Sequence, residues 1–318
     1  MRIVELSEIE KALEGLDVLP LIEAGFVAYS EGRAVVPPVG ELILDEGETH
    51  IKYGFISGEA WYVIKIASGF YKNPERGLPS GDGMMLLFSQ ATGQPVATLL
   101  DHGHLTDVRT AAAGAIGARY LAPRRVERIG VAGTGVQARL QVQHLKPITD
   151  CRSVLVWGRS DEKLEAYRRD MEAQGFEVAV TKDPAELGAR CNLIVTTTPA
   201  TEPLLQAEDI RPGTHVSAIG SDAPHKQELD PAILARASIV VADSRAQCRE
   251  RGEVARALDA GAISPDQVSE LGDVIAGKAP RRTDDDQVTV FDSTGVAVQD
   301  TQIASAVARG VGVRAPEA

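Results

Sequence analysis

The sequence contains little cysteine, and this limits the kinds of site it can form. Cys151, Cys191 and Cys248 are the three cysteines among 318 residues. They lie far apart and form no C-x-x-C pair, so neither a disulfide framework nor a thiolate zinc site is expected. We interpret them as buried or inert thiols.

Long apolar runs are also missing. A helix that spans a bilayer needs about 18 consecutive apolar residues, and the chain has no such run. The stretch MRIVELSEIEKALEG at the start carries acidic residues every few positions, unlike the basic and then apolar start of a secretory signal. We therefore expect a cytoplasmic protein without a membrane partner.

An excess of basic residues is absent as well. The 33 lysines and arginines are outnumbered by 45 acidic residues, which gives a formal net charge of -12. This charge opposes adsorption to a phosphate backbone, so nucleic acid is not an expected partner. A small anionic ligand is still compatible, because it responds to the local field of a pocket.

The order of the predicted elements indicates two domains of different type. Residues 124–270 alternate short β-branched runs with helix-like stretches, which is typical of a doubly wound parallel sheet covered by helices on both faces. Residues 35–100 instead contain strand-like runs separated by turn residues, which indicates antiparallel β structure. We expect an α/β nucleotide-binding domain over residues 122–297. A separate α+β domain is expected over residues 1–121, completed by residues 298–318.

The segment RIGVAGTGVQA, residues 128–138, combines a short strand, a glycine-rich turn and a helix start. In a dinucleotide-binding βαβ unit, the first glycine permits the tight turn and the second admits the pyrophosphate to backbone N–H groups. Gly133 and Gly135 match these roles, and Ala138 takes the third position, where the helix packs closely on the strand. The flanking strand and helix favour a Rossmann domain over an incidental turn. Further residues expected at the cofactor are Val136, Gln137, Thr197 and Gly220.

The end of the second strand of this unit indicates which dinucleotide binds. An NAD site places an acidic residue there, which accepts a hydrogen bond from the ribose 2′-hydroxyl. This chain has Arg159 and Ser160 with no acid before Asp161, and a guanidinium with a hydroxyl suits a 2′-phosphate. NADP(H) is therefore favoured, with NAD(H) as the alternative. Arg159 would otherwise be a solvent-exposed loop residue.

Two cationic residues outside the nucleotide-binding domain stand among apolar or small residues. Lys65 lies in WYVIKIAS, and Arg109 lies in DVRTAAAGA. A buried lysine is costly unless it is paired or used in chemistry. The alternatives are a lysine that extends to solvent from a sheet edge and an arginine on a helix surface.

Asp222 follows a predicted strand of the parallel sheet, in HVSAIGSDAPHKQELD. Ligands bind at the carboxyl ends of such strands, so this acid is a candidate proton donor or acceptor. Capping of the next helix is the alternative role, but Asp230 ahead of Pro231 fits that role better. His102 and His104 offer two imidazoles without a third ligand at zinc spacing, so no metal site is expected.

Several of these segments together resemble the ornithine cyclodeaminase/mu-crystallin family. GTGVQA, the RTAA of residues 109–112, the Gly-x-Asp around Asp222 and the VTVFDSTGVAVQD of residues 288–300 look like its motifs. The likeness covers nearly the whole chain. The family implies a homodimer in which the first domain, completed by the C-terminal helix, supplies the subunit contact and half of each active site.

The resemblance also implies roles for single residues. Lys65 and Arg109 match the ligands of the substrate carboxylate, and Ser80 falls where the family has a hydroxyl near the substrate. Asp222 matches the residue that exchanges a proton with the substrate nitrogen. Two cations would fix the carboxylate and direct the adjacent C=N carbon at the nicotinamide.

Two positions depart from the family pattern. Glu41 stands where many members have a further carboxylate-binding arginine. Lys52 stands where ornithine cyclodeaminase has an acid for the distal ammonium, and it would repel that group. The segments around Lys65 and Arg109 look most like the ectoine-utilisation branch and its imine-reducing relatives. A substrate with a second carboxylate would suit Lys52.

These observations predict an oxidoreductase that acts on CH–NH or CH–NH2 groups in amino-acid metabolism. It would reduce α-imino acids, either a ketimine such as pyrroline-2-carboxylate or iminosuccinate, to L-amino acids with NAD(P)H. An ornithine cyclodeaminase-type ammonia lyase is the alternative within the family. A non-catalytic protein that binds NADP and a small ligand is the alternative from another class.

Overall fold

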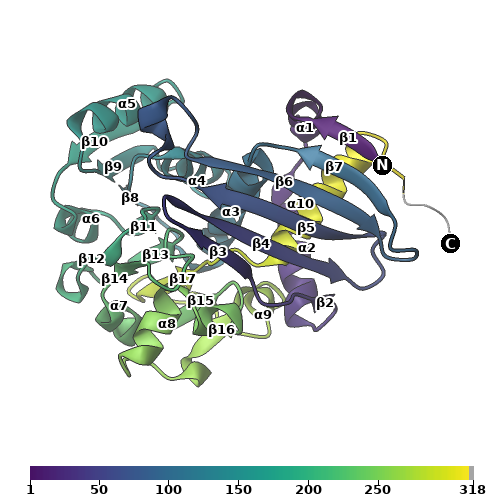
Figure 1. Cartoon of the computed structure of the whole chain (residues 1–318). Coiled ribbons are helices and arrows are strands. Elements are labelled where there is room, and N and C mark those ends of the chain that lie inside the picture. The colour runs from purple at the N-terminus through teal and green to yellow at the C-terminus, as the bar shows by residue number, and fades with distance from the viewer. Residues whose placement is uncertain (315–318) are drawn as a thin grey trace. The chain divides into compact units, whose positions relative to one another are not determined.

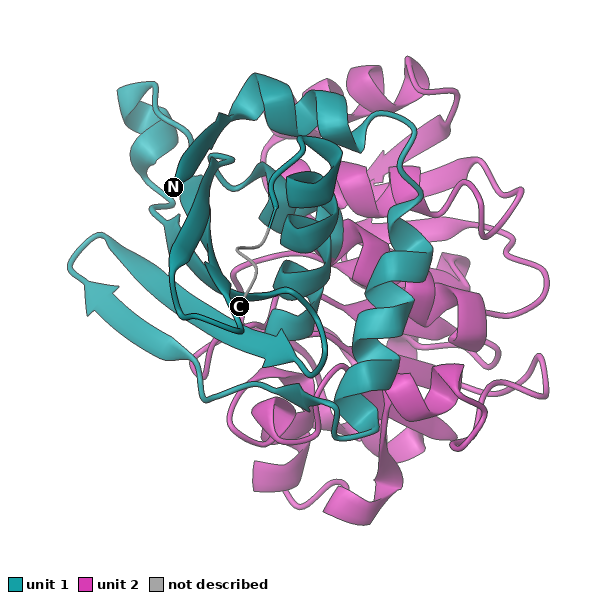
Figure 2. Cartoon of the chain, turned by 90° about the vertical axis from the view of Figure 1, so that its right-hand side faces the viewer, with its two compact units in different colours: residues 1–109, 296–318 teal, residues 110–295 magenta. Residues whose placement is uncertain are grey.

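The computed structural model describes residues 1–314 and forms two compact units (Figure 2). Unit 1 comprises Met1–Arg109 together with Val296–Ala318, and unit 2 comprises Thr110–Gly295. The end of the expected range 298–318, residues 315–318, lies outside the described residues. The first break falls inside helix α3 (His104–Leu121), whereas the sequence analysis places it after residue 121.

Unit 1 is built on a mixed sheet with the strand order β1-β7-β6-β5-β4-β2, and β3 also pairs with β4. The pairs among β2 to β7 are antiparallel, as expected for residues 35–100, whereas β1 joins β7 in parallel. The elements are β1 (Arg2–Glu5), α1 (Leu6–Leu13), α2 (Val18–Ser30), β2 (Ala34–Val35), β3 (Gly40–Leu44), β4 (Gly47–Ile56), β5 (Trp61–Gly69), η1 (Asn73–Arg76), β6 (Gly81–Ser89), β7 (Pro95–Leu100) and α10 (Ala297–Gly310).

Helix α10 completes the core of unit 1. It packs beside α2 and against strands β4 and β5, as Figure 1 shows for the yellow and purple helices. The two helices approach closely at Gly25, where an added Cβ would lie 3.0 Å from Cγ of Gln302. Residues encoded at opposite ends of the sequence therefore share one core.

Unit 2 is a doubly wound α/β domain, as predicted. Its eight-stranded sheet has the order β10-β9-β8-β11-β13-β17-β15-β16, and every pair is parallel. The chain proceeds outward from β8 in both directions, so the carboxyl ends of β8 and β11 form the switch point where such folds bind ligands.

The elements of unit 2 after α3 are β8 (Ile129–Ala132), α4 (Val136–His144), β9 (Ser153–Trp157), α5 (Asp161–Glu172), β10 (Glu177–Thr181), α6 (Ala185–Arg190), β11 (Leu193–Thr196), β12 (Thr201–Leu205), η2 (Ala207–Asp209), β13 (His215–Ala218), β14 (Gln227–Leu229), α7 (Pro231–Arg236), β15 (Ile239–Ala242), η3 (Gln247–Arg249), α8 (Gly252–Asp259), η4 (Pro265–Gln267), β16 (Val268–Glu270), α9 (Leu271–Ile275) and β17 (Thr289–Asp292). Strands β12 and β14 form a separate two-stranded sheet.

Both faces of the large sheet are buried, which explains its continuous apolar strands. Along β9, Leu155 and Trp157 belong to one apolar cluster, and Val154 and Val156 belong to another. Successive side chains of a strand point to opposite faces, so the two clusters lie on the two sides of the sheet.

Helix α3 packs tightly where its small residues were noted. An added Cβ at Gly117 would lie 2.4 Å from Cδ1 of the buried Phe291 ring, so the helix backbone approaches β17 directly. Within residues 1–314, no helix has the length and apolar content needed to cross a membrane. Cys191 and Cys248 are buried and Cys151 is half-buried, and all three are free thiols.

Candidate functional site

The turn between β8 and α4 has the geometry of a phosphate-binding loop. Gly133 has φ +116°, a conformation that L side chains rarely adopt, and an added Cβ would lie 2.7 Å from Oγ1 of Thr197. Thr197 donates from that hydroxyl to the carbonyl of Ala132 at 3.0 Å, which joins the ends of β11 and β8. Gly135 immediately precedes α4, and the space where its Cβ would project is open to 4 Å. A pyrophosphate fits here, because the helix N-terminus presents backbone N–H groups without side-chain obstruction.

The other residues expected around this loop also lie in unit 2. Val136 is 57% exposed in the first turn of α4, and Gln137 accepts a hydrogen bond from Nε2 of Gln141 at 3.3 Å. Gly220 follows β13, and its backbone N–H donates to Glu228. Gly220 cannot carry a side chain, since a Cβ would lie 2.4 Å from the carbonyl oxygen of Thr198.

The end of β9 carries three polar residues that bear on the choice of dinucleotide. Arg159 is exposed, and its carbonyl accepts from Nζ of Lys182 at 2.6 Å. Lys182 also pairs with Asp161 at 3.0 Å. Ser160 caps α5 by accepting a 3.4 Å hydrogen bond from the N–H of Lys163. The sequence analysis missed Lys182, although its place just after β10 puts it next to the end of β9.

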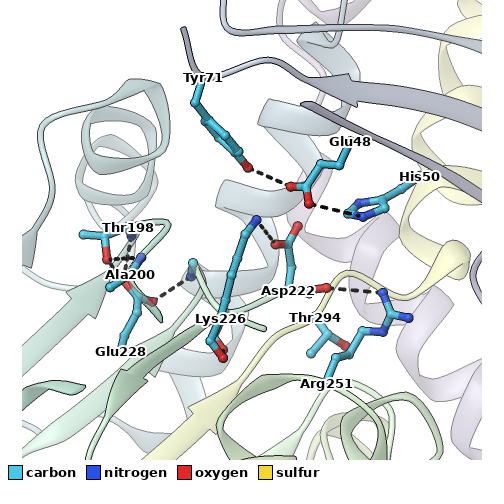
Figure 3. A network of polar contacts seen from close by, with 12 residues as sticks. Glu48, His50, Tyr71, Thr198, Ala200, Asp222, Lys226, Glu228, Arg251 and Thr294 are labelled. Atoms are coloured by element: carbon cyan, nitrogen blue, oxygen red, sulfur yellow. Dashed lines mark hydrogen bonds and ion pairs between the residues drawn. The ribbon is translucent and has the colours of Figure 1, made fainter. Parts of the chain in front are cut away.

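Glu228 connects the ends of two neighbouring strands at the switch point (Figure 3). Its Oε2 accepts from the hydroxyl of Thr196 at 2.7 Å and from the N–H of Gly220 at 2.9 Å. Its Oε1 accepts from the N–H and the hydroxyl of Thr198 at 2.6 and 2.7 Å. Burial raises the pKa of this carboxyl to about 7 despite these donors. The sequence analysis did not single out Glu228, because its partners come from β11 and β13.

Asp222 lies in the loop after β13 and is held by a lysine (Figure 3). Nζ of the almost fully buried Lys226 contacts its Oδ1 at 2.8 Å, while the Asp222 side chain is 35% exposed. The Asp222 carbonyl accepts from Arg251 at 3.4 Å. The prediction for the helix cap is confirmed, since Asp230 precedes α7 and accepts from the N–H of Ala232 at 2.9 Å. Asp222 is thus not a cap but a carboxylate with a fixed cationic partner.

Unit 1 buries the two cations singled out from the sequence. Lys65 is 2% exposed and Arg109 is 4% exposed, so the solvent-facing alternatives are wrong. Asp300 of α10 lies between them, with Oδ2 at 3.4 Å from Nζ of Lys65 and Oδ1 at 2.9 Å from Nε of Arg109. Gln299 accepts a further 2.9 Å hydrogen bond from Arg109. Asp300 lies in the VTVFDSTGVAVQD motif, but no role was predicted for it from the sequence.

The charge state of Lys65 reflects this environment. Burial, followed by repulsion from Arg109 and Lys52, lowers the pKa of Lys65 to about 7, although the Asp300 carboxylate raises it. Lys52 is buried and stands directly opposite Lys65 in the β4–β5 register. The structure therefore brings Lys52, Lys65 and Arg109 together as one cationic group.

The other departure from the family pattern, Glu41, pairs with a histidine of β4. Its Oε1 lies 2.9 Å from Nε2 of His50, and Glu48 lies 3.9 Å from the same nitrogen. Tyr71 donates to Glu48 at 2.9 Å, as the upper part of Figure 3 shows. Ser80 is exposed in the loop that precedes β6.

A metal centre has no donor set in the part of the chain that the structure describes. No three histidine, cysteine or acidic residues within residues 1–314 come close enough to hold an ion. His102 instead lies 3.1 Å from Asp82.

The doubly wound sheet, the glycine loop and the buried cations define a protein with an NAD-binding Rossmann fold. The sequence profile of the ornithine cyclodeaminase/mu-crystallin family matches residues 2–311. The chain therefore belongs to this family.

Relatives in the family carry different activities. A Sinorhizobium fredii protein named as the uncharacterised cyclodeaminase y4tK is 42% identical over 311 residues, which cover 96% of this chain and 94% of that protein. The iminosuccinate reductase of Paracoccus denitrificans is 36% identical over 314 residues, which cover 96% and 95%.

Solved structures extend the likeness to the fold. The same iminosuccinate reductase in complex with NAD+ matches with a TM-score of 0.84 and covers 98% of this chain and 96% of that one. The Thermococcus litoralis Delta(1)-pyrroline-2-carboxylate reductase in complex with NADH and L-proline matches with a TM-score of 0.92. It is 25% identical and covers 98% and 99% of the two chains.

Proposed function

We propose that the protein is an NAD(P)H-dependent reductase of α-imino acids that forms L-amino acids. The observation that carries this proposal is the buried cationic group of Lys52, Lys65 and Arg109, two of which share the carboxylate of Asp300. Clustered buried cations favour an anionic ligand, because the low dielectric strengthens its attraction. An α-imino acid supplies a carboxylate next to its C=N carbon.

The cations would orient the substrate. Arg109 offers a planar guanidinium and Lys65 a point charge, and together they restrict rotation of a bound carboxylate. A fixed carboxylate places the neighbouring C=N carbon at one position, which removes much of the entropic cost of the reaction.

Asp222 would handle the proton. A nicotinamide held by unit 2 would supply a hydride to the C=N carbon, and the substrate nitrogen would gain one proton overall. Asp222, held in place by Lys226, would exchange that proton with the nitrogen or pair with the cationic iminium. The same carboxylate would accept the proton in the reverse direction.

The cofactor is proposed to be NADP(H), with NAD(H) as the alternative. Arg159 and Lys182 place two cations at the end of β9, where a 2′-phosphate would lie, and their charge exceeds that of Asp161. The two solved relatives named above contain NAD+ or NADH, which supports the alternative.

Lys52 would select the side chain of the substrate. A buried ammonium beside Lys65 favours a second carboxylate, as in iminosuccinate, and the P. denitrificans relative is named for that substrate. The same charge disfavours ornithine, because its distal ammonium would be repelled. Cyclodeamination remains the second candidate, since the protein from S. fredii is named a cyclodeaminase.

The test is oxidation of the reduced cofactor, followed by absorbance at neutral pH. NADPH and NADH are each supplied with pyrroline-2-carboxylate, piperideine-2-carboxylate and iminosuccinate generated in place. We expect oxidation with at least one imine and the highest rate with iminosuccinate. A Lys52→Met variant should lose the preference for iminosuccinate but keep activity on pyrroline-2-carboxylate.

Ornithine provides the matched control for the second candidate. In the contrary outcome, ornithine releases ammonia without a net change in cofactor while no imine supports oxidation of the reduced cofactor. That result would contradict the proposed reductase and support the cyclodeaminase.

A further inference from the structure

Asp300 is a buried carboxylate that faces two cations. It is 1% exposed on α10, and its two oxygens contact Nζ of Lys65 at 3.4 Å and Nε of Arg109 at 2.9 Å. An ionised carboxylate in such an interior is retained only where opposite charges compensate its lost hydration. Lys65 and Arg109 supply that compensation from β5 and α3.

The contacts of Asp300 are ion pairs, and the Asp300 carboxylate raises the pKa of Lys65 both by its charge and by a side-chain hydrogen bond. Arg109 has a second anchor, because its Nη1 donates to Gln299 at 2.9 Å. Lys65 is therefore the partner whose state depends most on the Asp300 charge.

Charged groups from three elements act on Lys65. Arg109 on α3 and Lys52 on β4 oppose its ammonium, while Asp300 on α10 favours it. Asp101, which accepts from the N–H of Leu105 at the start of α3, also interacts with Lys65. Burial raises the pKa of Asp101.

We propose that Asp300 is a positioning residue that maintains the positive charge of Lys65, so that a substrate carboxylate meets two cations instead of one. The inference deepens the proposed function, on which it rests. Asp300 acts through Lys65 and has no direct contact with the substrate.

The proposal has a consequence for pH dependence. An ammonium is present below its pKa and lost above it, so carboxylate binding weakens as the pH rises through about 7, the pKa of Lys65. Without Asp300 the pKa of Lys65 falls further, and the loss of binding begins at lower pH.

The experiment compares Asp300→Asn with the wild-type protein. Asn has almost the same volume, so it removes the charge while few hydrogen bonds are lost. The probe is pyrrole-2-carboxylate, and its Kd is measured by calorimetry from pH 6 to 9 with saturating NADH. We expect the pH at which binding weakens to move down by at least about one unit, which raises Kd at pH 7.5 about tenfold.

Two further variants separate charge from packing. Asp300→Glu restores the carboxylate and should restore the wild-type pH dependence. Ser305→Ala removes another buried polar group from α10 without changing charge, and it should leave the pH dependence unchanged. An unchanged Kd profile in Asp300→Asn overturns the proposal, because a residue that only fills space would give that result.

Folding of Asp300→Asn is followed by circular dichroism and by NADH binding. We expect it to fold, because Lys65 can release its proton when its partner charge is removed. If it does not fold, the double variant Lys65→Met/Asp300→Asn replaces it. Its Kd should then equal that of Lys65→Met within about threefold, and a larger loss overturns the proposal.

The outcomes are distinguishable from a failure of the proposed function. Binding of the probe requires no turnover, so the Asp300 result stands even if no imine is reduced. Absence of probe binding by the wild-type protein throughout pH 6 to 9 overturns the inference itself.

Discussion

Asp222 is a partly exposed carboxylate that has a buried cationic partner. It is partly exposed at the carboxyl end of β13, as a group that meets substrate must be, and it is ion-paired with the buried Lys226. The pair fixes the carboxylate in place, which the proposed exchange of a proton with the substrate nitrogen requires.

Asp222→Asn should therefore lower kcat by at least about 100-fold, because an amide cannot exchange the proton. NADH affinity should change less than about twofold, since the glycine loop is untouched. Steady-state kinetics and fluorescence titration check both values. Asp230→Asn is the matched control, because asparagine caps a helix as well as aspartate does, and it should behave as wild type. Equal activity of both variants would remove Asp222 from the reaction.

We expect Arg159 to determine the preference between NADPH and NADH. Arg159→Ala should lower kcat/KM for NADPH about tenfold and leave kcat/KM for NADH nearly unchanged, because the 2′-phosphate would lose a charge-assisted contact. Arg169→Ala removes an exposed arginine from the end of α5 and serves as the control. Equal losses with both cofactors would show that Arg159 does not recognise the phosphate.

The sequence identified those residues whose local surroundings are unusual. Lys65 stands within an apolar strand, and Gly133 stands in a turn between a strand and a helix. Their neighbours in the sequence are therefore sufficient to identify them as candidate site residues. Asp300 and Glu228 were not assigned roles, because their partners come from distant segments. A buried carboxylate is recognisable only once the fold supplies the groups that compensate it.

Among the elements, strand β17 and helix α8 contain a group of buried acids that should affect stability. Burial raises the pKa of Asp292 from 3.8 to about 7, and it raises the pKa of Glu253 as well. A carboxyl whose pKa is higher in the folded state stabilises the fold at low pH, and this contribution is lost as the pH rises through about 7.

Asp292→Asn should remove this loss of folding stability at higher pH. The free energy of unfolding of the variant relative to wild type should rise by about 2–3 kcal/mol between pH 5 and pH 8, since each pKa unit corresponds to about 1.4 kcal/mol. Denaturant titrations at several pH values measure the difference. Asp286→Asn, at an exposed acid just before β17, should show no such trend. A pH-independent difference in Asp292→Asn would contradict the assignment.

Helix α3 provides a prediction about packing. Gly117→Ala should lower the free energy of unfolding by about 1–3 kcal/mol, because the new methyl group overlaps the buried ring of Phe291. Gly114→Ala should cost less, since its nearest neighbour is the end of the Gln141 side chain, which can turn aside. Thermal unfolding ranks the two, and the reverse order would contradict this account.

Most elements of unit 2 follow from apolar runs and glycine signals, so the parallel sheet was predictable. Strand β1 was not, because only Val4 of its four residues is buried and no alternation is visible. Ser160 is a second example of a feature that the sequence alone does not predict. Its hydroxyl was assigned to the cofactor from its position, whereas the helix-capping contact depends on backbone geometry at α5.

At the scale of the whole molecule, β3 exposes three consecutive apolar side chains. Leu42, Ile43 and Leu44 are 56%, 67% and 49% exposed, and they point to alternate faces of the strand. Exposed apolar strands tend to associate with other chains, so we expect a second copy of the chain to pack on β3.

Ile43→Glu should weaken that association. We expect wild type to migrate as a dimer and the variant to shift towards monomer in light scattering coupled to gel filtration. Ile3→Glu changes an equally apolar position on β1, at the other end of the strand order, and should remain dimeric. A dimer that is unaffected by Ile43→Glu would place the contact elsewhere.

Unit 1 requires helix α10, which is translated after all of unit 2. The ribosome releases the strands of unit 1 early, then all of unit 2, and only then the helix that covers the sheet and carries Asp300. Unit 2 can complete its core during synthesis, whereas unit 1 must keep an uncovered apolar sheet until α10 has been translated. Contacts of such high sequence separation also slow folding. Chaperone demand during biosynthesis should therefore come chiefly from unit 1, and removal of α10 from the gene should damage the product more than its length suggests.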